Sequence, residues 1–90
     1  MLNNKSILIT GGTGSLGQAL VKMILEKWPD VKRLVVYSRD EQKQFQMNQQ
    51  FPISKHRALR YFIGDVRDYD RLKTALKGID IVFHAAAMKH

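Results

Sequence analysis

Four short apolar runs recur along the chain, and a stretch of helical periodicity separates each run from the next. The apolar runs predict strands at residues 6–10, 33–37, 60–63 and 80–84. The first run is continuously apolar rather than alternating, which is typical of strands that helices cover on both faces. The stretches between the runs predict helices at residues 15–28, 38–50 and 69–76.

Helical spacing also predicts which residues of the first helix face the core. Leu16, Leu20, Met23, Ile24 and Trp28 recur at intervals of three and four residues. This spacing places apolar side chains on one face of a helix. We therefore expect these five side chains to pack against the sheet.

Polar residues mark the starts of the other two helices. Ser38 and Glu41 have the spacing of a capping box, which predicts that the second helix begins at Ser38 and ends near Gln50. Asp68 stands just before the third helix, where an acidic side chain can cap the first turn. Gly78 follows that helix and is predicted to end it.

The strict alternation of strands and helices predicts an α/β fold. Three right-handed crossovers between four strands give a Rossmann-type parallel sheet of order 3-2-1-4, with helices on both faces. Ninety residues allow one small domain at most. A fourth strand with nothing after it would leave Ile81 and Phe83 poorly covered and one sheet edge unpaired. Residues 1–90 are therefore expected to be the N-terminal part of a Rossmann domain in a longer enzyme.

A glycine cluster joins the first strand to the first helix. Gly12, Gly14 and Gly17 give the pattern G-x-G-x-x-G, while Gly11, Gly14 and Gly17 give G-x-x-G-x-x-G. Such a loop lets backbone approach a ligand closely, and the following helix presents unpaired N–H groups and a partial positive charge. The pattern predicts a pyrophosphate site. The alternative is a turn that only packs the helix on the strand.

Four segments of the chain are predicted to meet at one edge of the sheet. The glycine loop and residues 38–40, 65–66 and 85–87 each follow the carboxyl end of a strand. In a parallel sheet these ends share one edge, and ligands bind there where the strand order reverses. This convergence is a stronger argument for a nucleotide site than any single motif.

Charge and composition narrow the class of protein. The formal net charge is +7, but no block of five like charges occurs, so nucleic-acid binding is not expected. The chain has no cysteine, which excludes disulfides and thiolate metal sites, and no metal site is expected. No apolar run is long enough to cross a membrane, and the N-terminus lacks the form of a signal peptide. A soluble, cytoplasmic protein is expected.

The end of the second strand indicates which cofactor would bind. An NAD site usually has an acidic residue about 20 positions beyond the loop, and Asp40 is near that distance. However, Ser38 and Arg39 come first, and Lys43 follows. A guanidinium would bind a ribose 2′-phosphate, which predicts NADP rather than NAD, with Asp40 and Glu41 turned toward the helix start. The alternative is that Arg39 only pairs with a surface carboxylate.

These motifs resemble a known family. Residues 10–17, TGGTGSLG, match the phosphate loop of extended short-chain dehydrogenases/reductases, which the whole chain resembles. Residues 37–41, 61–68 and 84–90 (YSRDE, YFIGDVRD and HAAAMKH) are similar, more narrowly, to the inverting UDP-N-acetylglucosamine 4,6-dehydratases. Those enzymes begin pseudaminic acid synthesis, and close relatives serve surface polysaccharide assembly.

The resemblance implies a reaction, a cofactor and partners. Hydride would leave C4 of a UDP-sugar for NADP⁺ and return at C6, water would leave across C5–C6, and C5 would be inverted. The net reaction is a dehydration, so the enzyme is a lyase that regenerates its cofactor. The full-length enzyme would be a homo-oligomer.

The resemblance also implies roles for individual residues. The pyrophosphate would lie on Thr13, Gly14, Ser15 and Leu16, between Gly11 and Gly17. The adenosine ribose phosphate would be surrounded by Ser38, Arg39, Asp40, Glu41, Gln42 and Lys43. Asp65 and Val66 would border the adenine, with Asp65 accepting a hydrogen bond from its amino group. Close to the cofactor would pass Ala85, Ala86 and Ala87, and Lys89 would reach the nicotinamide ribose or the substrate phosphates.

The catalytic residues of that family are not matched within the chain. Tyr69 and Lys73 have Tyr-x-x-x-Lys spacing, but they precede the fourth strand, whereas the family pair lies on a later helix. Residues 1–90 alone are therefore expected to be inactive. Two alternatives stay open, a related nucleotide-sugar epimerase or reductase and a non-catalytic nucleotide-binding module.

Overall fold

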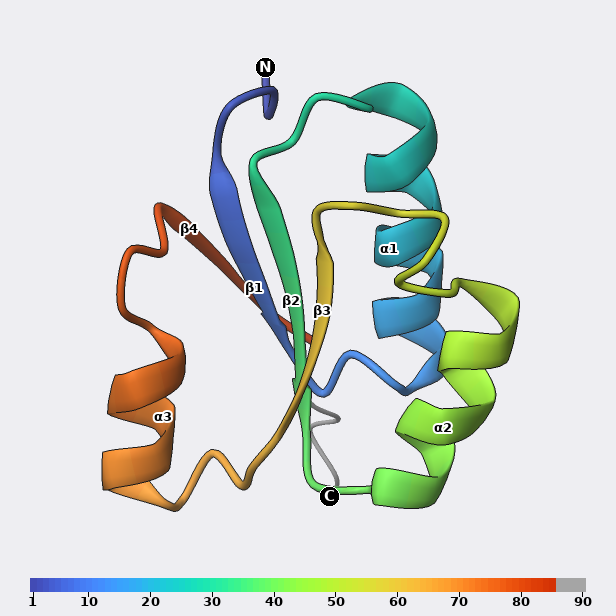
Figure 1. Ribbon diagram of the computed structural model, residues 1–90. Coiled ribbons are helices and arrows are strands. Elements are labelled where there is room, and N and C mark those ends of the chain that lie inside the picture. Colours follow the sequence, from blue (N-terminus) through green and yellow to red (C-terminus); the bar gives the residue numbers. More distant parts are fainter. Residues whose placement is uncertain (86–90) are drawn as a thin grey trace.

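The computed structural model describes residues 1–85, which form a four-stranded parallel sheet with the order β3-β2-β1-β4 (Figure 1). The elements in chain order are β1 (Ser6–Thr10), α1 (Ser15–Lys27), β2 (Arg33–Ser38), α2 (Glu41–Gln50), β3 (Leu59–Ile63), α3 (Tyr69–Ala75) and β4 (Ile81–His84). The predicted α/β class and strand order are confirmed.

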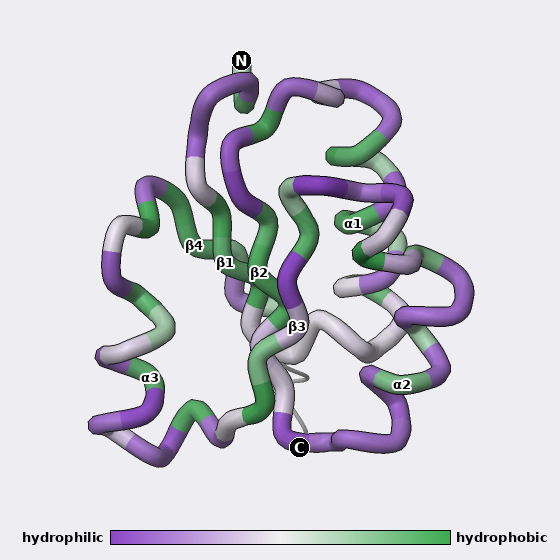
Figure 2. The backbone as a smooth tube through the Cα atoms, viewed as in Figure 1, coloured by the Kyte–Doolittle hydropathy of each residue, from purple (hydrophilic) through white to green (hydrophobic). Residues whose placement is uncertain are grey.

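Two hydrophobic layers cover the two faces of the sheet. Ile7 and Ile9 of β1 pack with Val21 and Ile24 of α1 in the larger cluster, which Met47 of α2 also joins. Leu8 points to the opposite face. It belongs to a smaller cluster with Val35, Tyr37 and Ala75 of α3. The apolar strands therefore lie between α1 and α2 on one side and α3 on the other (Figures 1 and 2). In the described part of the chain, no helix is both long and apolar enough to span a bilayer.

The inward face of α1 differs in part from the prediction. Ile24 is buried, and Leu20 and Trp28 pack against the larger cluster, as predicted. The other buried residues of the helix are Gly17 and Val21, whereas Leu16 and Met23 are 58% and 43% exposed. The reason is the contact between Gly17 and Gly12, which is so close that no side chain fits between helix and loop. This contact fixes the rotation of the helix and turns Leu16 and Met23 outward.

The start of α2 also differs from the prediction. Ser38 is the last residue of β2, where it pairs with Ile63, so it does not cap the helix. Asp40 is the cap instead, and its Oδ1 accepts a hydrogen bond from the backbone N–H of Lys43 at 3.0 Å. In α3 the predicted cap is confirmed, since Asp68 accepts from the N–H of Arg71 at 3.2 Å.

The open face of β4 is not the predicted one. Ile81 and Phe83 are partly buried against the larger cluster, and Val82 between them is 48% exposed. Alternate residues of a strand point to opposite faces, so Val82 lies on the face that carries α3. The smaller cluster on that face does not include Val82.

A buried glutamine joins α2 to the ends of β2 and β3. The Gln44 amide nitrogen donates to the hydroxyl and the carbonyl of Ser38 and to the carbonyl of Phe62, at 2.8, 3.2 and 3.1 Å. Removing a donor from buried acceptors costs about 1–3 kcal/mol. We expect Gln44→Leu to lower the free energy of unfolding by about that amount in urea titrations. Gln49→Leu, at an exposed position of the same helix, is the matched control. Equal effects of the two substitutions would contradict this role of Gln44.

Candidate nucleotide site

The carboxyl ends of β1, β2 and β3 meet at one edge of the sheet, as predicted (Figure 1). A groove of about 530 Å³ lies there, lined by Gly11, Thr13, Gly14, Tyr37, Ser38, Arg39, Asp40, Lys43, Gly64, Asp65, Val66 and Arg67. A second hollow of about 350 Å³ shares Thr13, Gly14 and Lys43 with it and extends between α1 and α2. Segments that are distant in the sequence therefore form one surface.

Three glycines of the glycine loop are required for the folding of the loop, whether or not a ligand binds. Gly11 has a φ of +64°, and its N–H donates to the Tyr37 carbonyl at 2.9 Å. A Cβ on Gly12 would lie 2.7 Å from Cγ1 of Val36, and one on Gly17 would lie 2.5 Å from the carbonyl carbon of Gly12. These glycines allow the loop to turn and α1 to pack tightly against it.

Gly14 is a different case. A Cβ there would lie 3.5 Å from the Gly11 carbonyl oxygen, which is an ordinary contact. Gly14 is the N-cap of α1, so no side chain caps this helix, and the first turn contains no acidic residue. The first N–H groups of a helix have no acceptor within the helix, and here they adjoin the groove. The loop itself is held by Gln18, whose amide donates to the Thr13 carbonyl at 2.9 Å.

Asp40 is engaged at the start of α2. Because its carboxylate accepts the Lys43 N–H, it turns toward the helix start, as predicted. A carboxylate in this position interacts favourably with the helix dipole. Arg39, one residue earlier, has a side chain that is 73% exposed at the groove. The end of β2 therefore presents a guanidinium.

Asp65, after β3, is held by Arg67. The Arg67 Nη2 lies 2.9 Å from Asp65 Oδ2, and the backbone N–H of Arg67 donates to Oδ1 at 2.9 Å. These hydrogen bonds hold the pKa of the Asp65 carboxyl well below its usual range. Arg39 Nη1 is farther away, at 3.7 Å from Oδ2. The surface pairing that was the alternative for Arg39 is thus present, but it is long and exposed, and such pairs contribute little to stability.

Tyr37 supports the same loop, a role that no sequence pattern indicated. It is fully buried, burial raises the pKa of its phenol, and its hydroxyl donates to the Asp65 carbonyl at 2.9 Å. A Cβ on Gly64 would lie 2.5 Å from Cζ of Tyr37. Gly64 is therefore needed for packing on the tyrosine ring.

Some predicted site residues lie away from the groove. Gly17 is buried against Gly12, and Leu16 is exposed on α1. Glu41 borders a shallow hollow on the β3 side of α2, and Gln42 is exposed on the same helix. Ala85 follows β4 and donates its N–H to the Thr10 carbonyl at 2.9 Å. The predictions for Ala86, Ala87 and Lys89 lie outside the described residues.

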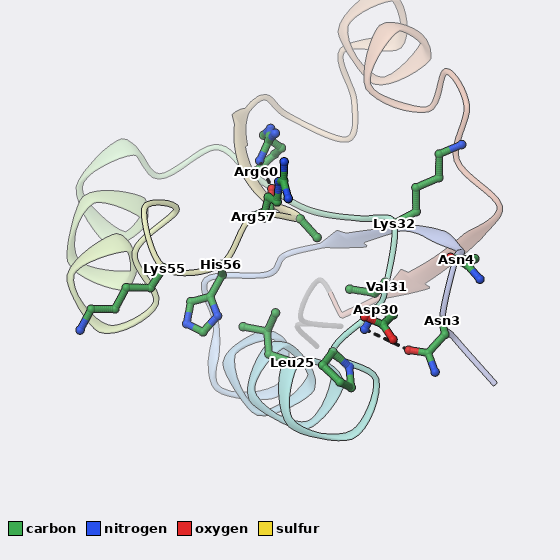
Figure 3. A pocket seen from close by; sticks show the side chains of 12 residues that line it. Asn3, Asn4, Leu25, Asp30, Val31, Lys32, Lys55, His56, Arg57 and Arg60 are labelled. Atoms are coloured by element: carbon green, nitrogen blue, oxygen red, sulfur yellow. Dashed lines mark hydrogen bonds between the residues drawn. The ribbon is translucent and has the colours of Figure 1, made fainter.

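A hollow of about 930 Å³, larger than either part of the groove, lies at the opposite edge of the sheet and contains none of the predicted site residues (Figure 3). Its basic side chains do not converge, since Lys32 and Lys55 point away from one another (Figure 3). The Arg60 guanidinium is bonded to the carbonyls of Arg57 and Leu59, both at 2.7 Å. Size alone therefore does not make this hollow the better candidate. Within residues 1–85 no group of three or more potential metal ligands occurs.

Comparison with known proteins agrees with the fold. A family model described as "polysaccharide biosynthesis protein" matches residues 7–90. The chain is 53% identical to a UDP-N-acetylglucosamine 4,6-dehydratase (inverting) of Campylobacter jejuni, over 100% of the chain and 26% of the relative. It is 44% identical to a UDP-glucose 4-epimerase of Rickettsia bellii, over 99% of the chain and 26% of the relative. The chain thus spans about a quarter of the length of these relatives.

Two solved structures are also similar. The X-ray structure of Pen from Bacillus thuringiensis superposes with a TM-score of 0.87 at 42% identity, over 100% of this chain and 27% of that one. An NADPH-bound carbonyl reductase from chicken fatty liver superposes with a TM-score of 0.70 at 26% identity, over 90% of this chain and 36% of that one.

Proposed function

Because the chain belongs to the polysaccharide biosynthesis protein family, we propose that it is the N-terminal, cofactor-binding part of a nucleotide-sugar dehydratase. The full-length protein would use NADP and dehydrate UDP-N-acetylglucosamine with inversion at C5, in pseudaminic acid or surface polysaccharide synthesis. The observation that carries the proposal is the groove at the carboxyl edge, where an uncapped helix N-terminus and the Arg39 guanidinium face the same space. The similarity to the dehydratase of Campylobacter jejuni supports the choice of reaction.

The residues at this edge fit a dinucleotide. The N–H groups of Thr13 and of the first turn of α1, from Ser15 onward, would bind the pyrophosphate, because they adjoin the groove and no side chain caps this helix. Gly14, whose own N–H donates to the Gly11 carbonyl at 3.2 Å, would let the phosphate approach the backbone. Leu16 would contribute only its backbone, since its side chain is exposed on the helix. Gly11 and Gly17 would act indirectly, by shaping the loop.

The ribose phosphate would lie where the second strand ends. Arg39 and Lys43 would supply positive charge to a 2′-phosphate, and both line the groove. Ser38 also lines the groove, and its hydroxyl accepts a hydrogen bond from Gln44, so its own hydrogen could still be donated to the phosphate. The Asp40 carboxylate caps α2, so it would be held at the helix start and would not repel the 2′-phosphate. Glu41, on the β3 side of α2, and Gln42, exposed on the same helix, would lie at most at the margin of this subsite.

Asp65 and Val66 would border the adenine. Arg67 and Tyr37 hold the side chain and the main chain of Asp65, respectively, so the carboxylate is fixed as an acceptor. Ala85, Ala86, Ala87 and Lys89 would continue the site toward the nicotinamide and the substrate phosphates, as the resemblance implies. The bound nicotinamide would supply a hydride acceptor that is regenerated in each cycle.

The catalytic residues are expected beyond residue 90, as a Ser-Thr-Asp-Lys segment and a Tyr-x-x-x-Lys pair. We also propose that the full-length enzyme works in the cytoplasm as a homo-oligomer.

Product analysis of the full-length protein tests the reaction. Incubation with UDP-N-acetylglucosamine is expected to give a 4-keto-6-deoxy sugar nucleotide with inverted C5, without net consumption of NADP. Nuclear magnetic resonance of the product distinguishes this outcome from epimerisation. A C4 epimer that retains the C6 hydroxyl would support the epimerase alternative, which the Rickettsia relatives favour. Cofactor binding with no turnover of any UDP-sugar would support a non-catalytic module.

A further inference from the structure

We propose that Arg67 determines cofactor specificity, because it holds the Asp65 carboxylate and thereby leaves the Arg39 guanidinium available to a 2′-phosphate. This inference rests on the proposed function, in which Arg39 recognises that phosphate. Arg67 has no part in the roles that the resemblance implies.

The geometry places two arginines around one carboxylate. Arg67 contacts Asp65 through its backbone N–H and both Nε and Nη2 of its guanidinium, at 2.9 to 3.3 Å. Arg39 Nη1 lies at 3.7 Å from the same Oδ2, which is beyond hydrogen-bond distance. The carboxylate is therefore already engaged, and Arg39 keeps its donors.

Arg67 also changes the charge of the groove. Arg39, Lys43 and Arg67 are the basic residues of its lining, against Asp40 and Asp65. Without Arg67, the nearest cation to Asp65 would be Arg39. Asp65 would then draw the Arg39 guanidinium into a closer pair and would itself repel an incoming phosphate.

The loss should be selective for one cofactor. A 2′-phosphate carries negative charge and needs Arg39, whereas the 2′-hydroxyl of NAD needs neither guanidinium. The Arg67 side chain is 77% exposed. The Asp65 main chain is held separately, by the Tyr37 hydroxyl. A purely structural role for Arg67 would weaken the binding of both cofactors alike, so the ratio of their affinities distinguishes the two roles.

The test is calorimetric titration of the full-length protein with NADP and with NAD, after bound nucleotide has been removed. We expect Arg67→Ala to weaken NADP binding about tenfold and NAD binding by less than about twofold. The double variant Asp65→Asn/Arg67→Ala should regain the wild-type preference, because no carboxylate then competes for Arg39. Lys73→Ala, at an exposed position of α3, is the control for loss of one positive charge.

Each outcome decides a different claim. One outcome is that the wild type prefers NADP while Arg67→Ala keeps that preference or weakens the binding of both cofactors equally. In that case the proposed role of Arg67 is contradicted, and the proposed function stands. A double variant that stays as unselective as Arg67→Ala would also overturn that role. If the wild type prefers NAD or binds neither cofactor, the proposed cofactor site fails, and the inference about Arg67 fails with it.

Discussion

Replacing Gly17 by alanine is expected to lower the free energy of unfolding by about 2 kcal/mol, although alanine is the better helix former. The added Cβ would meet the Gly12 backbone, 2.5 Å from its carbonyl carbon. Overpacking of this kind costs about 1–3 kcal/mol or more, and the gain in helix propensity recovers only about 1 kcal/mol. We place the net loss high because the obstructing atoms are backbone, which cannot move without shifting the whole loop. Urea titration monitored by circular dichroism measures the loss.

Gly14→Ala is the matched control, three residues earlier in the same loop. Its Cβ has room, so the free energy of unfolding should change by less than about 0.5 kcal/mol. Its effect should appear instead in weaker cofactor binding, which Gly14→Val should weaken further, because a side chain there stands where phosphate would approach. Equal stability losses for Gly17→Ala and Gly14→Ala would contradict the packing argument.

Replacing Arg39 by alanine is expected to reduce the preference of the full-length protein for NADP over NAD by about ten- to a hundredfold. A charged hydrogen bond contributes about 1.5–3 kcal/mol, which corresponds to that range. The effect should be specific because the Arg39 side chain is 73% exposed and makes only a long contact to Asp65. Folding should therefore be unchanged, and the ratio of the two dissociation constants reports the loss.

Arg57→Ala is the control for Arg39→Ala, since Arg57 is exposed at the opposite edge of the sheet. It removes the same charge from the molecule but not from the groove. A similar loss of preference in both variants would mean that net charge, rather than the guanidinium at the end of β2, selects the cofactor.

The fold could be predicted from the sequence because its signals are local and mutually consistent. Ile7, Leu8 and Ile9 form a continuous apolar run, and the glycines that follow it break the strand at one place. Once four strands alternate with three helices, the handedness of the crossovers leaves few topologies. The strand order then brings the glycine loop and the loops after β2 and β3 to one edge.

Two local predictions failed because tertiary contacts overrode them. The periodicity of α1 could not show that Gly17 packs on Gly12, so Leu16 and Met23 were expected on the wrong face. Similarly, the capping-box spacing of Ser38 could not show that Ser38 pairs with Ile63 in the sheet, which leaves Asp40 as the cap.

The supports of the candidate site could not be predicted because they join residues that no sequence pattern links. Tyr37 reaches the Asp65 carbonyl and lies on Gly64, and Gln44 of α2 bonds to both Ser38 and Phe62. The sequence indicated no separate role for Arg67, which was only one residue of the family-like segment 61–68. The contacts of Tyr37 and Gln44 depend on the spacing of neighbouring strands, which the structure supplies, whereas the contact of Arg67 with Asp65 depends on the conformation of one loop.

The most direct test of the central claim is calorimetric titration of the nucleotide-free, full-length wild-type protein with NADP and NAD. We expect NADP to bind about ten- to a hundredfold more tightly, because Arg39 engages the 2′-phosphate while Asp40 caps α2. Tighter binding of NAD, or no binding of either cofactor, would contradict the assignment of this edge of the sheet as an NADP site.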